Sequence, residues 1–175
     1  KAGLLGPDLN FAHANTLSYE EYKLIADSGA SISVTPEIEM MMGHGYPAIG
    51  LFMENGGRPS LGVDVVVSTG GDMFAQMKFA LQAERSRINE KILATGEMPV
   101  EFTISARDIL EFATIDGARA LGLDHKTGTL TPGKEADLIM IRTNDLNMFP
   151  VNHPIGAVVQ CANPSNVDSV FVAGK

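Results

Sequence analysis

Short apolar runs alternate with helical patterns through the first two thirds of the chain. Each run has the length of a strand, and the segment after it carries apolar residues at helical spacing or a helix-capping signal. Because parallel neighbours in a sheet are joined by crossover helices, this order predicts an α/β fold built on parallel strands. The predicted strands are residues 9–13, 31–35 and 59–64, and the predicted helices are residues 18–29, 47–55, 73–91 and one that begins after Ser105.

Capping residues mark the ends of these helices. Ser18, followed three residues later by Glu21, forms the pattern of a capping box, and Gly29 occupies the usual position after a helix. Asp72 and Ser105 are predicted to cap the two later helices, because their short oxygen-bearing side chains can accept from a free backbone N–H.

The last third of the chain changes character. After a turn-rich segment at residues 126–134, three apolar runs follow without a helical pattern between them, which predicts a small antiparallel or mixed sheet. We therefore divide the chain into an α/β part, residues 1–124, and an appended β part, residues 125–175. The three apolar runs are residues 137–142, 157–161 and 167–172.

Composition limits the partners of this chain. Its 175 residues are 45% hydrophobic and 19% charged, which supports a core and excludes a disordered chain. The 13 basic and 21 acidic residues give a net charge of -8, so the surface repels nucleic acid and anionic membranes. No apolar stretch reaches the roughly 18–20 residues of a membrane span. We expect a small-molecule partner, with a homo-oligomer as a possibility left open.

Cys161 is the only cysteine in the sequence, which excludes an intramolecular disulfide framework and a multi-cysteine zinc site. A lone thiol is typical of a reducing compartment, so we expect a cytoplasmic protein. With no histidine near it in sequence, Cys161 is expected to be an inert core thiol in the predicted strand 157–161. His125, beside a turn, and His153, before a proline, are expected to be structural.

Two residues at strand ends are candidates for chemistry. His13 ends the first predicted strand and Asp64 the third, and parallel strands present their carboxyl ends at the edge where α/β proteins build sites. A divalent metal accepts imidazole and carboxylate ligands, and a carboxylate can take a proton from water. The alternative is a packed histidine and a helix-capping aspartate. If the strands are neighbours, the two side chains lie within about 10 Å of each other.

The segment 37–46 is rich in methionine and glycine and is predicted to be a long loop. His44 lies between two glycines, which let a loop approach a ligand closely, and Met41 with its methionine neighbours would form an adaptable apolar wall. The alternative is a surface loop with its methionines packed beneath it. Glu37 and Glu39 are expected to be solvated loop charges, or else to meet a cationic or amine-bearing ligand.

Five segments follow one another in an order known from one family. They are the histidine motif at residues 13–18, the strand and proline at 33–36, the strand and aspartate at 61–64, the helix at 114–123 and the turn-rich return at 128–139. This order resembles the C-terminal half of the metal-dependent amidohydrolase superfamily, in the branch of cytosine and guanine deaminases and triazine hydrolases. The resemblance covers nearly the whole chain.

The resemblance implies a fold and a reaction. Residues 1–124 would be the C-terminal portion of a TIM-type (β/α) barrel, with strands six to eight and the closing helices, and residues 125–175 would be part of a small β-sandwich. The implied reaction is hydrolysis of a carbon–nitrogen bond other than a peptide bond by metal-activated water, such as deamination of a cyclic or heteroaromatic substrate.

The resemblance also implies roles for the candidate residues. Asp64 would be both metal ligand and proton shuttle, and His13 would hydrogen-bond the attacking water or the substrate oxygen. The loop that carries Glu37, Met41 and His44 would line the substrate pocket.

The implied cofactor is a divalent metal, zinc or alternatively iron. The family's H-x-H pair and the histidine and acid of its fifth strand are absent from this sequence, so the remaining ligands are expected upstream of Lys1. We therefore expect a segment cut from a longer chain and inactive alone. The competing hypothesis is a non-catalytic α/β binding or scaffold domain, which an upstream H-x-H motif would exclude.

Overall fold

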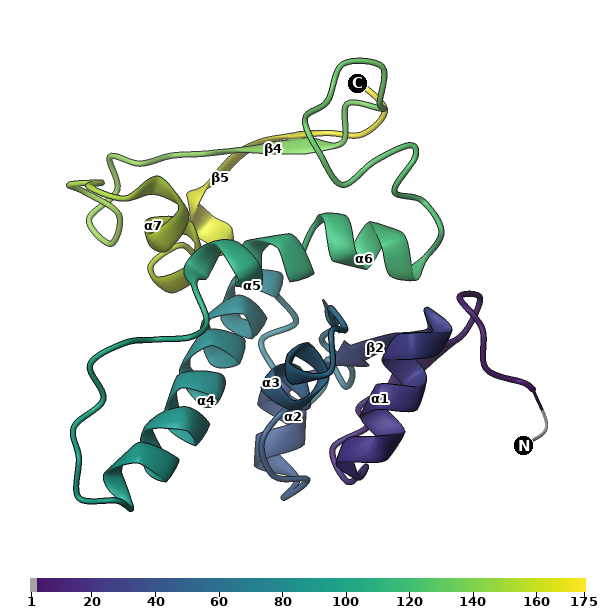
Figure 1. Ribbon diagram of the computed structural model, residues 1–175. Helices are drawn as coiled ribbons and strands as arrows, with labels where there is room; N and C mark the ends of the chain where they lie inside the picture. Colours follow the sequence, from purple (N-terminus) through teal and green to yellow (C-terminus); the bar gives the residue numbers. More distant parts are fainter. Residues whose placement is uncertain (1–2) are drawn as a thin grey trace.

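A three-stranded parallel sheet and a two-stranded antiparallel ribbon organise the chain (Figure 1). The computed structural model describes residues 3–175, and in this range the parallel sheet has the order β1–β2–β3, as the alternating pattern predicts. The strands are β1 (Asn10–Ala12), β2 (Ser31–Val34), β3 (Ser60–Leu61), β4 (Leu138–Ile141) and β5 (Val167–Phe171). The helices are α1 (Tyr19–Ser28), α2 (Pro36–Met41), α3 (Ile49–Glu54), α4 (Met73–Leu93), α5 (Ala106–Phe112), α6 (Ile115–Ala120) and α7 (Pro154–Gln160), with a 3-10 turn at Pro164–Asn166.

The predicted capping residues set the helix ends. Before α1, the Ser18 side chain accepts from the Glu21 backbone, and the Ser18 backbone N–H donates to the Glu21 carboxylate at 2.8 Å, which confirms the capping box. These hydrogen bonds lower the pKa of Glu21. Gly29 ends α1 with a φ of 79°, a left-handed conformation that glycine adopts without steric cost. Asp72 caps α4 by accepting from the Ala75 N–H at 2.8 Å.

The core lies between the parallel sheet and the helices that cover it. α4 is the longest helix of the described chain, and it packs against α2, α3, α5 and α7. The largest apolar side chains removed from water include Tyr22, Ile32, Ile49, Phe52, Leu81, Ile109 and Phe112. Their burial supplies the main stabilisation of the fold, at roughly 25 cal/mol per Å² of apolar surface.

One arginine closes the amino-terminal edge of the sheet. Arg58 precedes β3, donates to Asp116 of α6 at 2.8 Å and to Glu111 of α5 at 2.9 Å, and lies over the ring of Phe112. In Figure 1, α5 and α6 lie between the parallel sheet and the β4–β5 ribbon. The carboxyl-terminal edge, on the opposite side, is therefore left for a site.

The expectation of a loop throughout residues 37–46 is wrong, because the segment begins in a helix. α2 runs from Pro36 to Met41, with proline at the first helical position. Proline is favoured there because the first helical residues need no N–H donor. Glu37 and Glu39 add negative charge near the positive end of the helix dipole. Only the part after α2 is irregular.

The strand predicted at residues 157–161 is wrong as well. This apolar run lies in α7, which begins at Pro154 and is capped by His153, whose Nδ1 accepts from the Gly156 N–H at 2.8 Å. An apolar run of this length does not distinguish a strand from a helix by its periodicity. The cap confirms the structural role expected for His153, and the ribbon formed by β4 and β5 is two-stranded.

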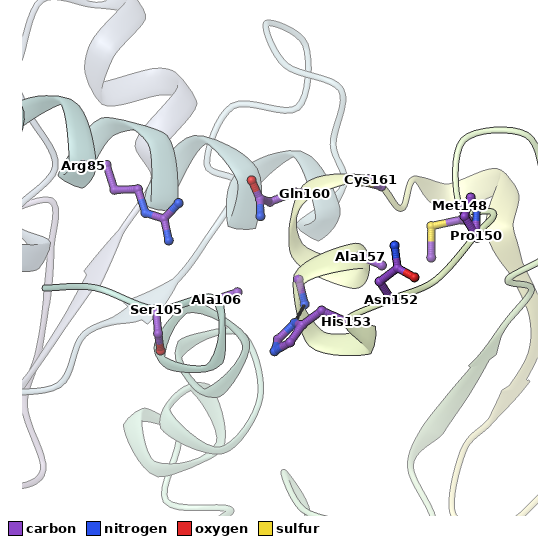
Figure 2. A pocket seen from close by; sticks show the side chains of 11 residues that line it. Arg85, Ser105, Ala106, Met148, Pro150, Asn152, His153, Ala157, Gln160 and Cys161 are labelled. Carbon is purple, nitrogen blue, oxygen red and sulfur yellow. Dashed lines mark hydrogen bonds between the residues drawn. The ribbon is translucent and has the colours of Figure 1, made fainter. Parts of the chain in front are cut away.

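Cys161 is exposed at the end of α7, so the expectation of a buried core thiol is wrong. Figure 2 shows it at the rim of a pocket of about 470 Å³ that Arg85 of α4, Ser105 before α5 and His153 also line. None of the side chains that line this pocket is a candidate catalytic residue. Within residues 3–175, no helix combines the length and apolar character needed to cross a membrane.

Candidate functional site

The two strand-end candidates converge at the carboxyl-terminal edge of the sheet. His13 directly follows β1, and its N–H donates to the Ser33 carbonyl of β2 at 2.8 Å. Asp64 follows β3, whose path is held by the Gly62 N–H donating to the Val34 carbonyl at 2.8 Å. The imidazole Nε2 of His13 lies 3.9 Å from Oδ2 of Asp64. The expected convergence within about 10 Å is confirmed, while the chemical roles of both residues stay predictions.

Both residues have a left-handed backbone, with a φ of 68° at His13 and 64° at Asp64. For residues other than glycine, this region costs about 1–3 kcal/mol, because the Cβ approaches the backbone closely. Such conformations persist where the surrounding structure holds them, and they cluster at functional sites. The backbone turns here aim the two side chains at each other across β2.

A buried glutamate contacts the Nδ1 side of the His13 ring. Glu39 of α2 has no exposed surface, and its Oε1 lies 3.2 Å from the imidazole Nδ1 of His13. The same oxygen accepts from the backbone N–H of Thr35 at 2.9 Å, and the Thr35 hydroxyl lies 3.1 Å from Nδ1. The expectation of a solvated charge at Glu39 is wrong, because α2 turns this side chain inward beneath the site.

His44 also reaches the site. Its ring meets the ring of His13 edge to face, with 5.8 Å between the centroids. The irregular segment that carries it is anchored at Tyr46 by two hydrogen bonds: the amide of Asn15 donates to the Tyr46 carbonyl at 3.0 Å, and the Tyr46 hydroxyl donates to Glu90 of α4 at 3.0 Å. His44 is thus held beside the His13–Asp64 pair rather than on a free loop.

The other two candidates lie at the margin. Glu37 accepts from the Gln76 side chain of α4 at 2.8 Å, and its own N–H donates back to Gln76, so this carboxylate is already occupied in fixing α2 on α4. Met41 ends α2 with 57% of its surface exposed. The structure places both on the same helix as Glu39, and their predicted contact with substrate stays a prediction.

The donor set fits one side of a metal site. The Asp64 side chain is 34% exposed, and 3.9 Å from Nε2 is beyond hydrogen-bond distance, so the lone pairs of its carboxylate remain available to a cation. Among residues 3–175, no three His, Cys, Asp or Glu side chains are grouped to hold an ion. The predicted role of Asp64 as a metal ligand stays a prediction, and an ion held there would need further ligands beyond these residues.

Comparison with known proteins identifies the relatives of this chain. The sequence model of the Amidohydrolase family matches residues 1–175. A 5-methylthioadenosine/S-adenosylhomocysteine deaminase of Teredinibacter turnerae is 33% identical over 174 residues, which cover 99% of this chain and 37% of that protein. A 5'-deoxyadenosine deaminase of Methanothermobacter thermautotrophicus is 29% identical over 176 residues, with coverage of 100% and 38%. The chain thus spans less than two fifths of the length of these relatives.

The fold has a solved counterpart. The crystal structure of an adenosine deaminase from Xanthomonas campestris with bound zinc superposes with a TM-score of 0.88 at 28% sequence identity. The match covers 99% of this chain and 37% of that structure.

Proposed function

The chain belongs to the amidohydrolase family, and we propose that it forms the C-terminal part of a metal-dependent hydrolase that deaminates a heteroaromatic substrate. The observation that carries the proposal is the meeting of His13 and Asp64 at the carboxyl-terminal edge of the parallel sheet, 3.9 Å apart. Hydrolases built on parallel α/β folds position their reacting groups at that edge. The relatives with deaminase names support the reaction type.

The proposed place of this chain in the whole protein follows from the same observations. Residues 1–124 would supply strands six to eight of a TIM-type barrel with the closing helices, and residues 125–175 would contribute to a small β-sandwich. The parallel order β1–β2–β3 supports the first part, and the antiparallel β4–β5 ribbon supports the second. The remaining strands and metal ligands would come from sequence upstream of Lys1.

Asp64 would hold the metal, for which zinc is proposed and iron is the alternative. Zinc accepts a carboxylate oxygen at about 2.0–2.2 Å, and the zinc in the Xanthomonas campestris structure supports the choice. When bound, such an ion supplies Lewis-acid chemistry that brings the pKa of water toward about 7. Activation of the water is the only part of the reaction that the proposal assigns to the metal.

The side chains of this chain would handle the protons. The water oxygen forms a bond to the ring carbon that carries the amino group, and Asp64 takes the proton that the water loses. Asp64 then gives that proton to the amino nitrogen, the carbon–nitrogen bond breaks, and ammonia leaves. The second water proton moves to the neighbouring ring nitrogen, which took the electron pair of the C=N bond on attack, and the ring keeps a carbonyl. His13 Nε2 faces the same space and would accept a hydrogen bond from the attacking water. His44 would contact the substrate from the side.

An adenine-type amine is the proposed substrate class. The names of the two relatives above include adenosine derivatives, and both relatives match essentially the whole of this chain. A purine ring also suits the imidazole of His44 beside the pair, and the methionine-rich end of α2 would add apolar, polarisable surface if it lines the pocket as proposed.

The test is made on the full-length protein, expressed with its upstream sequence and loaded with zinc. Ammonia release is measured with 5'-deoxyadenosine, 5-methylthioadenosine, guanine and a chlorotriazine. Release from the adenosine derivatives is the expected result. Release of chloride from the triazine instead would replace deamination by dechlorination. A full-length protein that binds these compounds without converting any of them would favour a binding or scaffold domain.

A further inference from the structure

We propose that Glu39 is a positioning residue that fixes the tautomer of His13, with the ring proton on Nδ1 and the free lone pair on Nε2. The inference rests on the proposed function, because it assigns Nε2 to the reacting water. Neither the family resemblance nor the comparisons single out Glu39.

The argument starts from the oxygen that faces the ring. Oε1 of Glu39 accepts from the backbone N–H of Thr35 at 2.9 Å, and a backbone N–H can only donate. Oε1 is therefore an acceptor whatever the protonation of the other oxygen. This atom lies 3.2 Å from Nδ1 of His13. Two lone pairs at that distance repel, so Nδ1 carries the hydrogen and donates it.

The threonine hydroxyl is consistent with this assignment. The Thr35 hydroxyl lies 3.4 Å from Oε1 of Glu39 and 3.1 Å from Nδ1 of His13. When it donates to Oε1, its own lone pair is free to receive the Nδ1 hydrogen. Thr35 and Glu39 then act together as acceptors for one donor, and the imidazole is held from behind by two groups of the same turn.

A tautomer fixed in this way determines the hydrogen-bonding role of Nε2 on the opposite side of the ring. In a neutral imidazole, one nitrogen is a donor and the other an acceptor. With the hydrogen on Nδ1, the Nε2 lone pair points toward Asp64, and the 3.9 Å gap to Oδ2 gives neither group a direct partner. That gap suits a hydroxyl or water that donates to Nε2, as the proposed reaction requires.

Burial shows that Glu39 is more than a surface cap for α2. The residue is 0% exposed, and its second oxygen, Oε2, has no hydrogen-bond partner within residues 3–175. Burying an incompletely satisfied carboxyl group costs free energy, which a solvated capping residue would avoid. The contact with His13 is the interaction that a simple cap would not need.

The test compares Glu39→Ala with Glu39→Gln in the zinc-loaded full-length protein. In Glu39→Gln, the amide oxygen is expected at the position of Oε1, where it can accept from the Thr35 N–H. The flipped orientation would place the amide NH₂ against that N–H, and two donors repel. Alanine removes the acceptor. Asp116→Asn is the matched control, since Asp116 is another buried carboxylate but pairs with Arg58 and Arg119 at the opposite edge of the sheet. The readouts are kcat, KM, zinc content and the ¹⁵N shifts of the His13 ring, assigned with His13→Asn.

We expect Glu39→Ala to lower kcat by about 10–100-fold, the loss typical when the hydrogen-bond partner of a metal-site residue is removed. KM and zinc content change little, and the ring of His13 loses its single Nδ1–H tautomer. Glu39→Gln keeps the tautomer and most of kcat. Asp116→Asn lowers the melting temperature but leaves the tautomer and the kcat of folded protein unchanged.

Either of two results overturns the inference. One is a Glu39→Ala variant whose His13 tautomer and kcat are both unchanged. The other is a wild-type protein whose His13 ring carries its proton on Nε2. If Glu39→Ala does not fold, the wild-type and Glu39→Gln spectra decide, because either spectrum with the proton on Nε2 overturns the assignment. A wild-type protein that releases no ammonia overturns the proposed function instead, and the NMR result separates the two failures.

Discussion

His13 and Asp64 follow the two outer strands of the parallel sheet, yet their side chains meet in front of the middle strand, with 3.9 Å between Nε2 and Oδ2. The spacing is too long for a hydrogen bond and short enough for one small group to touch both. It therefore fits the two proposed roles, in which Asp64 holds the ion and moves a proton while His13 orients the attacking group.

Replacing Asp64 should abolish most of the turnover. Asp64→Asn keeps the shape of the side chain but removes the base and weakens the proposed metal ligand. General acid–base catalysis alone contributes about 10²–10⁴-fold, so kcat should fall at least that far even when zinc is resupplied in excess. Steady-state kinetics of the full-length protein, with bound zinc measured on the same samples, checks this.

His13→Asn is the companion variant. It should also lower kcat but leave zinc content nearly intact, because its proposed partner is the water or the substrate rather than the ion. Near-normal turnover in Asp64→Asn would mean that the aspartate is only structural, and the proposed mechanism would then be wrong.

Replacing His44 should change binding more than chemistry. The ring lies beside His13, with 5.8 Å between centroids, and the segment that carries it is anchored through Tyr46. His44→Ala should therefore raise KM, or change the order of preferred substrates, while kcat for the best substrate stays close to normal. Full kinetics on the substrate panel measures both constants. A large loss of kcat with KM unchanged would place His44 among the catalytic groups instead.

Gly50 should tolerate no side chain. Its N–H donates to Glu84 at 3.2 Å, and a Cβ at this position would overlap the Glu84 carboxylate and the Arg87 guanidinium. Gly50→Ala should destabilise the protein by about 1–3 kcal/mol or more, the usual cost of overpacking a filled interior. Denaturant unfolding provides the measurement. Gly117→Ala is the control, because its Cβ would meet its nearest neighbour at 3.6 Å, an ordinary contact, and alanine favours a helix.

The Ser105 cap should give a pH-dependent contribution to stability. Burial raises the pKa of Asp108, but the hydrogen bonds with Ser105, together with the nearby charge of Arg58 and a backbone hydrogen bond of Asp108 itself, outweigh it and lower that pKa from 3.8. A lowered folded-state pKa adds stability above 3.8 that is lost as the pH falls through the folded value. Ser105→Ala should cost about 1 kcal/mol at neutral pH. The difference in unfolding free energy between Ser105→Ala and the wild type, measured by urea unfolding, should become smaller in acid. A difference that stays constant with pH would mean that Asp108 does not contribute to the effect of the cap.

Local signals in the sequence were sufficient for much of the fold. Ser18, Gly29, Asp72 and Ser105 each act on backbone groups a few residues away, so their effect is contained in the segment that carries them. The convergence of His13 and Asp64 was also predictable, because parallel strands bring their carboxyl ends together whatever the loops do.

The features that were missed depend on partners distant in sequence or on ambiguous short runs. The apolar residues of α7 fit a strand or a helix equally well, and packing on α4 and α5 decides between them. Glu39 gave no local sign of burial, because its burial needs β1 and β2 to bring His13 over α2. Pro36 at the first helical position was the available hint that Glu39 lies on a helix.

The left-handed backbone at His13 and Asp64 sets stability against the proposed activity at the same two positions. Glycine would relieve about 1–3 kcal/mol at each, yet it would remove the imidazole or the carboxylate. Selection for a more stable protein and selection for turnover therefore act in opposite directions on these codons. A lineage that no longer needed the reaction would gain stability by losing these side chains first, so glycine at both positions in a relative would be a signature of abandoned catalysis.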